Sequence, residues 1–285
     1  MTLHANIHDV TAHFEGKTHA ILQRYGPGPR VHYHAGLVDD PPAPDACAQV
    51  LRGRLVEAQE RILRYAAEAW NASIGLSGEI LDVGCGLGGG AIFWAQEFGA
   101  RVTAVTCVPS HANWVAQFAA RAGVETRVSS LVCDALEVSG ESCFDAAVAL
   151  DSSCYLVRAK WFQRLASLLR PGGRVFIMDC FLGRSQYQEQ FDRYWRTRIG
   201  TVEEYVAAAT QAGLGQESVY DISHRTRHFW TTTLALIRAE ARDLAPSGKN
   251  HAIGYDASLR AHALVRQGLS DRGLRYMLIS FRKPS

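Results

Sequence analysis

The sequence has little of what marks the specialised classes of protein. No apolar run reaches the ~18 residues that a transmembrane helix needs, and the N-terminal residues lack the positive charge and apolar run of a secretory signal. The net charge of +2, from 30 Lys and Arg against 28 Asp and Glu, is too small for a protein that coats nucleic acid through a basic field. We therefore expect a cytoplasmic protein that neither spans a membrane nor binds nucleic acid.

Metal and disulfide motifs are also missing. The seven cysteines are odd in number and include no CxxC pair. Of the eleven histidines, only His32 and His34 stand two residues apart, and no cysteine or carboxylate accompanies them at ligand spacing. We expect reduced thiols, most of them buried, and no metal site.

Apolar runs and helical stretches alternate from residue 79 onward, after a helix predicted at 51–70. The first five predicted strands are 79–84, 101–106, 130–133, 144–150 and 174–179. Helices are predicted between them at 91–98, 112–122 and 159–169. This alternation is typical of an α/β fold in which helices cover both faces of a parallel sheet. Ligands bind such sheets beyond the carboxyl ends of the strands, which places the candidate site at residues 84–90, 106–111, 133–136 and 150–155.

A glycine-rich turn follows the first predicted strand, in the sequence Asp82-Val83-Gly84-Cys85-Gly86 and onward to Gly90. Such a turn between a strand and a helix can form a nucleotide pocket, although it can also be a tight turn and nothing more. No GxxxxGK[ST] motif is present, which disfavours a P-loop. The carboxylate of Asp82 could accept hydrogen bonds from the turn or meet a cationic ligand.

With its neighbouring motifs, this turn resembles the first motif of class I S-adenosylmethionine (SAM)-dependent methyltransferases. The matching segments are ILDVGCGLGG (80–89), LVEAQ (55–59), VTAVTCVPSH (102–111), CDAL (133–136) and LLRPGG (168–173). The resemblance spans about residues 10–235. It implies a Rossmann-like doubly wound sheet of seven strands with the last one antiparallel, and the two remaining strands would be 217–222 and 275–281.

The resemblance implies that SAM is the cofactor and indicates which residues would bind it. They are Tyr25, Tyr33, Asp82, Gly84, Cys85, Gly86, Thr106, Cys107, His111, Asp134, Ala135, Leu136 and Leu150. One departure concerns the ribose, because Thr106 and Cys107 stand where many class I enzymes carry an acidic residue. The sterol and cyclopropane branch shares that loss, and which residue binds the ribose stays open.

The rest of the chain is expected to surround this domain. A proline-rich stretch at 39–44 separates an N-terminal helical arm or lid, residues 1–45, from a SAM-binding domain at 46–285. Two helical cap segments are expected at about 181–216 and 226–267. The arm could cover the pocket or reach a neighbouring subunit, so a homo-oligomer is possible.

Three segments resemble terpenoid C-methyltransferases, including geranyl diphosphate C-methyltransferases. They are Tyr33-His34-Ala35-Gly36, Asp151-Ser152-Ser153-Cys154-Tyr155, and the stretch from Asp221 to Trp230. The resemblance implies methylation of an olefinic carbon in a terpenoid or prenyl group during natural-product biosynthesis. In those enzymes the acidic residue of the second segment lies near the reacting olefin, a position that Asp151 takes here.

The chemistry suits the many aromatic residues. Methylating an alkene creates a carbocation, which then loses a proton or cyclises, and aromatic faces stabilise a cation by ~0.5–2 kcal/mol each. The candidate catalytic residues are Asp151, Tyr33, His34 and His228. The candidate substrate-binding residues are Tyr155, Tyr187, Phe181, Tyr194, Tyr220 and Trp230.

Several alternatives stay open. The aromatic spacing of Phe191, Tyr194 and Trp195 also fits the apolar face of a helix. Four arginines of the cap could bind a diphosphate or form a solvated surface: Arg184, Arg193, Arg196 and Arg198. The acceptor is either a free prenyl diphosphate or a prenyl chain on a larger natural product. The enzyme could instead methylate oxygen or nitrogen of a small aromatic natural product, and the chain could also bind SAM without catalysis.

Overall fold

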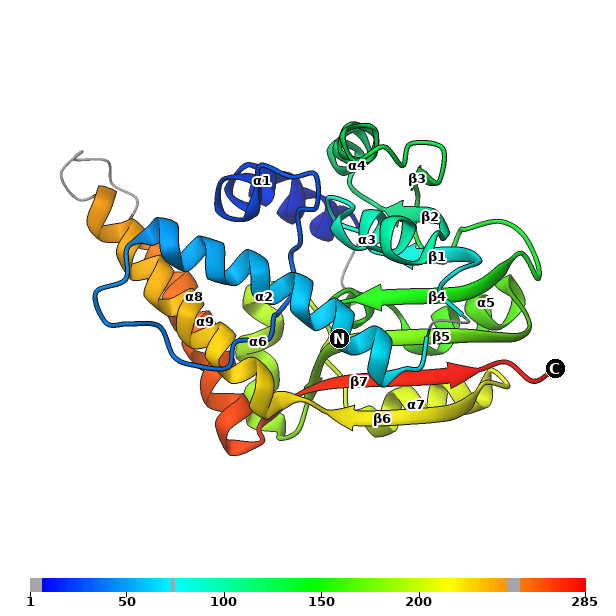
Figure 1. Cartoon of the computed structure of the whole chain (residues 1–285). Coiled ribbons are helices and arrows are strands. Elements are labelled where there is room, and N and C mark those ends of the chain that lie inside the picture. The colour runs from blue at the N-terminus through cyan, green and yellow to red at the C-terminus, as the bar shows by residue number, and fades with distance from the viewer. Residues whose placement is uncertain (1–6, 73–74, 245–251) are drawn as a thin grey trace.

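A seven-stranded sheet forms the centre of the protein, for which a computed structural model describes residues 7–72, 75–244 and 252–285 (Figure 1). The strand order is β3-β2-β1-β4-β5-β7-β6. The strands are β1 (Glu79–Val83), β2 (Arg101–Thr106), β3 (Val128–Val132), β4 (Phe144–Leu150), β5 (Leu169–Leu182), β6 (Gly215–Asp221) and β7 (Leu274–Arg282). Strand β7 runs antiparallel to both of its neighbours, β5 and β6, and the other neighbouring strands pair in parallel. The predicted fold class is thus confirmed.

Each central strand is buried on both faces, as the continuous apolar runs predict. In β1, Ile80 belongs to the core on one side of the sheet, and Leu81 belongs to the core on the other side. The first core contains side chains of α2 (Ala48–Ala69), α3 (Gly89–Phe98) and α4 (Pro109–Ala122). The second contains side chains of α5 (Arg158–Leu168) and α7 (Val202–Gln211).

Local sequence explains several boundaries. Helix α4 begins with Pro109, whose fixed φ suits the first turn of a helix. The side chain of Thr201 caps α7 and forms a reciprocal capping box with Glu204. Strand β5 is longer than the predicted 174–179 because its pairing with β7 continues as far as Leu182 opposite Leu274.

Four helices gather beyond the carboxyl ends of the parallel strands: α1 (Ile7–Tyr25), α6 (Gln188–Trp195), α8 (Ser223–Leu244) and α9 (Ala252–Asp271) (Figure 1). This arrangement corrects the cap predicted at 181–216, because only α6 lies over the strand ends, whereas α7 packs beside α5. The stretch predicted as a cap at 226–267 consists of two helices, α8 and α9, that pack against each other.

The N-terminal arm docks on its own chain. Thr11 donates a hydrogen bond to the carbonyl of Cys107 at 3.1 Å. The carboxylate of Glu15 accepts from the Ser110 hydroxyl at 2.6 Å, beside the N-terminus of α4. Helix α1 therefore lies against the segment that leaves β2, at the edge of the sheet where ligands are expected to bind.

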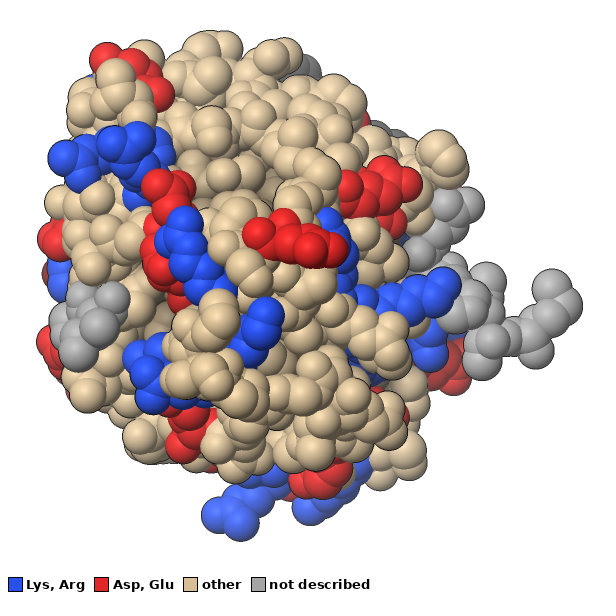
Figure 2. Space-filling view, turned by 90° about the vertical axis from the view of Figure 1, so that its right-hand side faces the viewer, with Lys and Arg blue, Asp and Glu red and all other residues tan. Residues whose placement is uncertain are grey.

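The surface carries both signs of charge. On the face shown in Figure 2, acidic and basic side chains are interspersed without a continuous field of one sign. Within the described residues, no helix is long and apolar enough to cross a membrane.

Candidate functional site

The larger of two adjoining cavities lies at the carboxyl ends of β1, β2 and β4 and holds about 1350 Å³ of empty space, its open mouth included. Its walls are the segments that follow the strands, together with residues of α1 such as Val10 and Phe14. The position matches the expectation that a parallel sheet binds ligands beyond its strand ends. We call it the cofactor cavity.

The predicted cofactor residues fall almost entirely in this cavity. Its walls include Tyr33, Asp82, Gly84, Cys85, Gly86, Thr106, Cys107, His111, Asp134, Ala135, Leu136 and Leu150. Tyr25 differs, because it lines the neighbouring cavity instead.

The glycine turn brings backbone to the cavity wall. Gly84 has φ of +70°, and a Cβ added there would lie 2.5 Å from the Cβ of Ser152. Ser152 holds the turn from the other side by donating its hydroxyl hydrogen bond to the Val83 carbonyl at 2.5 Å. Position 84 therefore requires glycine for two reasons: its backbone is left-handed, and there is no space for a Cβ atom.

Asp82 offers a buried acceptor that the protein itself does not fully use. Its side chain is 2% exposed, and its Oδ2 atom has no hydrogen-bond partner among the described residues. Burial raises the pKa of this carboxyl to about 7, against the opposing effect of a backbone hydrogen bond from Ala91. A cationic ligand in the cavity would satisfy the free oxygen, which fits the ammonium and sulfonium charges of SAM.

Two other predicted cofactor residues already bond to protein atoms. The Thr106 hydroxyl accepts from the Val108 N–H at 3.1 Å, ahead of α4. The Nε2 atom of His111 lies 2.9 Å from the Thr18 hydroxyl, which donates to the Phe14 carbonyl at 2.8 Å. His111 therefore donates to Thr18. It lines the cavity but also fastens α1, and burial lowers its pKa to about 4.

The second cavity holds about 660 Å³ of empty space, its opening included, and adjoins the first beneath α6, α8 and α9. We call it the acceptor cavity. Its aromatic walls are Phe14, Tyr25, Tyr33, Tyr155, Phe191, Trp195, Phe229, Trp230 and Tyr276. Among the described residues, no lysine or arginine lines it. Both cavities share Phe14, Tyr33, His34, Asp151 and Tyr155, which therefore form the boundary between them.

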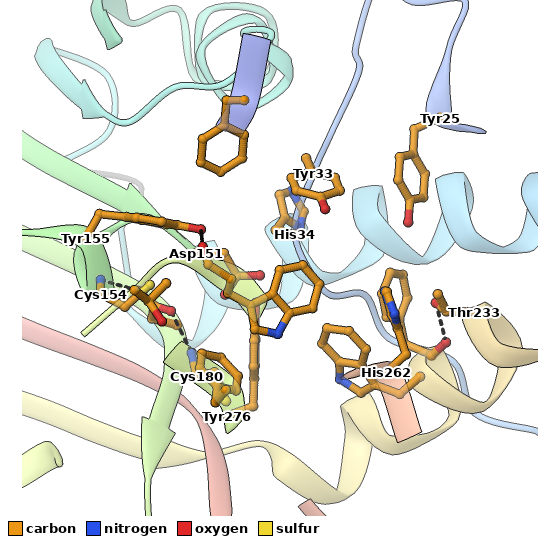
Figure 3. Close-up of a pocket in the computed structure, with 17 residues that line it drawn as sticks. Tyr25, Tyr33, His34, Asp151, Cys154, Tyr155, Cys180, Thr233, His262 and Tyr276 are labelled. Atoms are coloured by element: carbon orange, nitrogen blue, oxygen red, sulfur yellow. Dashed lines mark hydrogen bonds between the residues drawn. The ribbon is translucent and has the colours of Figure 1, made fainter. Parts of the chain in front are cut away.

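Asp151 stands at this boundary in a strained conformation, with φ of +48°. Its Oδ2 atom accepts from the Ala35 N–H at 3.0 Å, which ties the segment after α1 to the end of β4. Figure 3 shows Asp151 among the side chains that line the acceptor cavity. Burial and the neighbouring carboxylate of Asp179 raise the pKa of Asp151 well above its usual range.

Asp179 is a site residue that the sequence analysis missed. It lies in β5, is 2% exposed, and lines the acceptor cavity. Its carboxylate accepts hydrogen bonds from the Ser153 hydroxyl at 2.5 Å and the backbone N–H groups of Cys154 and Cys180 at 3.2 and 2.8 Å. The signal was present, because an acidic residue ends the predicted strand 174–179, just as Asp151 follows the strand at 144–150.

Two imidazoles face the acceptor cavity in the neutral state. The Nδ1 atom of His34 lies 2.7 Å from the Ala35 carbonyl, and that of His262 lies 2.7 Å from the Ser258 carbonyl. A carbonyl only accepts, so Nδ1 carries the hydrogen in both rings. Burial lowers the pKa of His34 to about 3 and that of His262 to about 4. No sequence motif signalled His262, which reaches the cavity only because α9 folds back along α8.

Three predicted substrate-binding residues pack away from both cavities. Phe181 is fully buried against Tyr205, with ring centroids 4.8 Å apart, on the side of the sheet covered by α7. The hydroxyl of Tyr187 donates to Asp271. Tyr220 is 44% exposed on the edge strand β6. Tyr155 and Trp230 do line the acceptor cavity.

The remaining predicted residues lie behind the cavity wall. The ring of Tyr194 packs against Trp195, with ring centroids 4.7 Å apart, but does not itself line the acceptor cavity. His228 belongs to α8 and lines neither cavity. Of the four cap arginines, Arg193 pairs with Glu189 on the exposed face of α6, and none of the four lines the acceptor cavity. Of the three aromatic residues of α6, Phe191 and Trp195 line the acceptor cavity, whereas Tyr194 does not.

Comparison with known proteins agrees with this geometry. Residues 80–173 match a family described as a methyltransferase domain. The chain is 28% identical to a geranyl diphosphate 2-C-methyltransferase of Streptomyces lasalocidi, over 70% of this chain and 69% of that one. It is 29% identical to the 27-O-demethylrifamycin SV methyltransferase of Amycolatopsis mediterranei (strain S699), over 72% and 77%.

Among solved structures, the fold matches a geranyl diphosphate C-methyltransferase from Streptomyces coelicolor A3(2), in complex with Mg²⁺, geranyl-S-thiolodiphosphate and S-adenosyl-L-homocysteine. The TM-score is 0.81 at 18% identity, over 99% of this chain and 100% of that one. At this identity the likeness shows the fold alone. Within the described residues, no group of three or more His, Cys, Asp or Glu side chains could hold a metal ion.

Proposed function

This chain is a SAM-dependent methyltransferase, and we propose that its methyl acceptor is an olefinic carbon of a terpenoid or prenyl group. SAM supplies an electrophilic methyl group from its sulfonium. The observation that carries the proposal is the composition of the acceptor cavity, which combines aromatic walls with a pair of carboxyl groups and no lysine or arginine among its described residues.

That composition suits a carbocation. The rings of Tyr33, Tyr155 and Trp195 present π-electrons to the cavity, and each desolvated face attracts a cation by ~0.5–2 kcal/mol. The acidic pair of Asp151 and Asp179 adds negative charge in the same wall. An oxygen or nitrogen acceptor would gain much less from such a wall, because it develops no carbocation.

The proposed catalytic roles belong to residues that both cavities share. Tyr33, His34, Asp151 and Tyr155 lie where the two cavities meet, which is where a methyl group would pass from cofactor to acceptor. We assign to Asp151 the removal of the proton whose loss ends the reaction. Tyr33 and Tyr155 would orient the olefin and shield the cation. Three relatives named geranyl diphosphate 2-C-methyltransferase support a prenyl acceptor.

A second candidate is methylation of oxygen. It is favoured by the neutral imidazoles of His34 and His262, whose Nδ1 atoms are already bonded to carbonyls. Each ring therefore keeps an unprotonated Nε2 atom that could accept a proton from a hydroxyl group. The rifamycin and erythromycin O-methyltransferases among the relatives fit this reading.

Product analysis with SAM carrying a carbon-13 methyl group separates the two candidates. The acceptors are geranyl diphosphate, with and without Mg²⁺, and neutral geranylated arenes. The proposal predicts a carbon-bound methyl signal in the carbon-13 NMR spectrum of the product. A methoxy signal from the geranylated phenols, with no carbon-bound methyl from any acceptor, would establish the second candidate instead.

The same panel identifies the polar end of the acceptor. The described residues of the cavity wall offer no cation to a diphosphate, so we favour a prenyl chain attached to a neutral scaffold. Faster turnover of geranyl diphosphate with Mg²⁺ than of every neutral acceptor would reverse that preference without changing the reaction class.

A further inference from the structure

The carboxyl groups of Asp151 and Asp179 are neighbours because their strands are neighbours. Leu150 of β4 pairs with Met178 of β5, and the N–H of Asp151 donates to the Met178 carbonyl at 2.8 Å. Both side chains line the acceptor cavity, and the negative charge of Asp179 raises the pKa of Asp151. Two neighbouring carboxylates that are both charged, away from water, repel strongly, so such a pair keeps one proton.

The hydrogen bonds around the pair show where that proton resides. Asp179 accepts from three donors, the Ser153 hydroxyl and the N–H groups of Cys154 and Cys180. Asp151 accepts one backbone hydrogen bond, from Ala35. Hydrogen-bond donors favour the ionised form of a carboxyl group. The negative charge therefore rests on Asp179, and the proton rests on Asp151.

We propose that Asp151 and Asp179 work as one base, in which Asp179 is a positioning residue that holds the negative charge and takes up the proton that Asp151 passes on. This inference rests on the proposed C-methylation, since it concerns the proton that ends that reaction. It adds a second residue to the single acidic position that the sequence indicated.

The step balances in atoms and charge. A C–H bond next to the cationic carbon breaks, and its electron pair forms the new C=C bond. The proton goes to one oxygen of Asp151, while the proton on the other oxygen of Asp151 moves to Asp179. The acceptor changes from +1 to neutral, and the pair changes from −1 to neutral. A protonated Asp151 can therefore still receive a proton, because it passes its own to Asp179.

The other ionisable groups facing the pair remain neutral. They are Cys154 after β4, Cys180 in β5, Tyr155, Tyr205 of α7 and Tyr276 of β7. Burial raises the pKa of each of these, and the negative pair raises it further. Tyr33 on the opposite wall also has a raised pKa because of burial. The imidazoles of His34 and His262 have lowered pKa values and stay uncharged near neutral pH.

Infrared spectroscopy of the ligand-free protein tests the shared proton without depending on any substrate. At pH 7 the wild type should show the carbonyl stretch of a protonated, buried carboxylic acid. D151N should remove that band. In D179N the band should disappear at a lower pH than in the wild type, because Asp151 then has no charged neighbour, although burial still raises its pKa. An unchanged titration of the band in D179N would overturn the proposal. D82N is the control, since it should remove a different band and leave this one intact.

The pH dependence of turnover tests the role in catalysis. In D179N the negative charge must rest on Asp151, which accepts one backbone hydrogen bond where Asp179 accepts three hydrogen bonds, so the acidic limb of kcat should move to higher pH while kcat falls. S153A removes one hydrogen-bond donor to Asp179, which disfavours the ionised pair. The acidic limb of kcat in this variant should therefore also move to higher pH. An unmoved limb in both variants would mean that Asp179 is only structural. If the product carries a methoxy group instead, the proposed function fails while the infrared result stands on its own.

Discussion

The two cavities are built in different ways, although they share a boundary. Most of the cofactor cavity wall comes from short segments directly after β1, β2, β3 and β4. The acceptor cavity is lined by side chains from almost the whole length of the chain, from Phe14 in α1 to Tyr276 in β7. The first wall depends on backbone turns at one edge of a sheet, and the second depends on how distant helices pack.

This difference decides which substitutions each cavity tolerates. The turn at Gly84 combines a left-handed backbone with no space for a side chain, so a change there should weaken binding strongly. A wall of many side chains spreads its contacts, so a single aromatic change should alter the fit of the acceptor and leave SAM binding intact. Cofactor binding and acceptor turnover can therefore be perturbed separately.

Substituting Gly84 with valine should produce the largest effect. A Cβ at this position would lie 2.5 Å from the Ser152 side chain, in a backbone with φ of +70°. We expect at least ~100-fold weaker binding of S-adenosylhomocysteine, measured by calorimetry, because the turn must move. Gly123→Ala is the matched control: Gly123 has φ of +69° with nothing within 4 Å of an added Cβ, so it introduces the strain without the clash. Equal affinities in the two variants would show that the turn does not form the cofactor wall.

Asp151→Asn should affect turnover and leave the cofactor in place. Loss of a positioned base costs roughly 10²–10³ in kcat, whereas the affinity for S-adenosylhomocysteine should stay near that of the wild type. The control is Asp145→Asn in the same strand, because Asp145 sits near the other end of β4 and pairs with Arg170 at 2.7 Å. If D151N turns over as fast as D145N, the boundary between the cavities does not contain the reacting groups.

The contrast between the cavities also explains what the sequence could predict. The turn at 84–90 and the strand-end segments 106–111, 133–136 and 150–155 are local in sequence, so strand prediction located them together. Phe191 and His262 contribute through the packing of α6, α8 and α9, which periodicity does not determine. Phe181 and Tyr187 were expected near the acceptor because they fall in the cap segment predicted at 181–216. Strand β5 instead continues to Leu182, with Phe181 in the core on the side of α5 and α7, and Tyr187 ends a short 3-10 helix (Ser185–Tyr187) beyond the strand.

Asp82→Asn should weaken cofactor binding less, and in a pH-dependent way. Losing a charge-assisted hydrogen bond of about 1.5–3 kcal/mol should weaken S-adenosylhomocysteine binding roughly 10–100-fold at pH 8. The wild-type carboxyl has a pKa of about 7, raised by burial. A cationic ligand requires the ionised form, so wild-type affinity should be full above pH 7 and fall by up to about tenfold per pH unit below it.

The variant should bind with the same affinity across that range, because asparagine does not titrate. The stability of the free protein gives a second measurement with its own sign. A carboxyl whose pKa is raised on folding stabilises the fold at low pH and loses that contribution as the pH rises towards 7. Equal pH dependence of binding in wild type and D82N would place the cation elsewhere in the cavity.

The smallest effect is expected at Tyr220, which the sequence placed at the substrate and the structure places on the edge strand β6, 44% exposed. Tyr220→Ser should leave kcat, KM and product identity within about twofold of the wild type, as for most exposed positions. Trp230→Leu is the informative partner, because Trp230 lines the acceptor cavity from α8 and should raise KM for the acceptor without changing cofactor affinity. A change in product or KM in the Tyr220 variant would extend the acceptor site beyond the cavity, to an edge of the sheet that the cap helices do not cover.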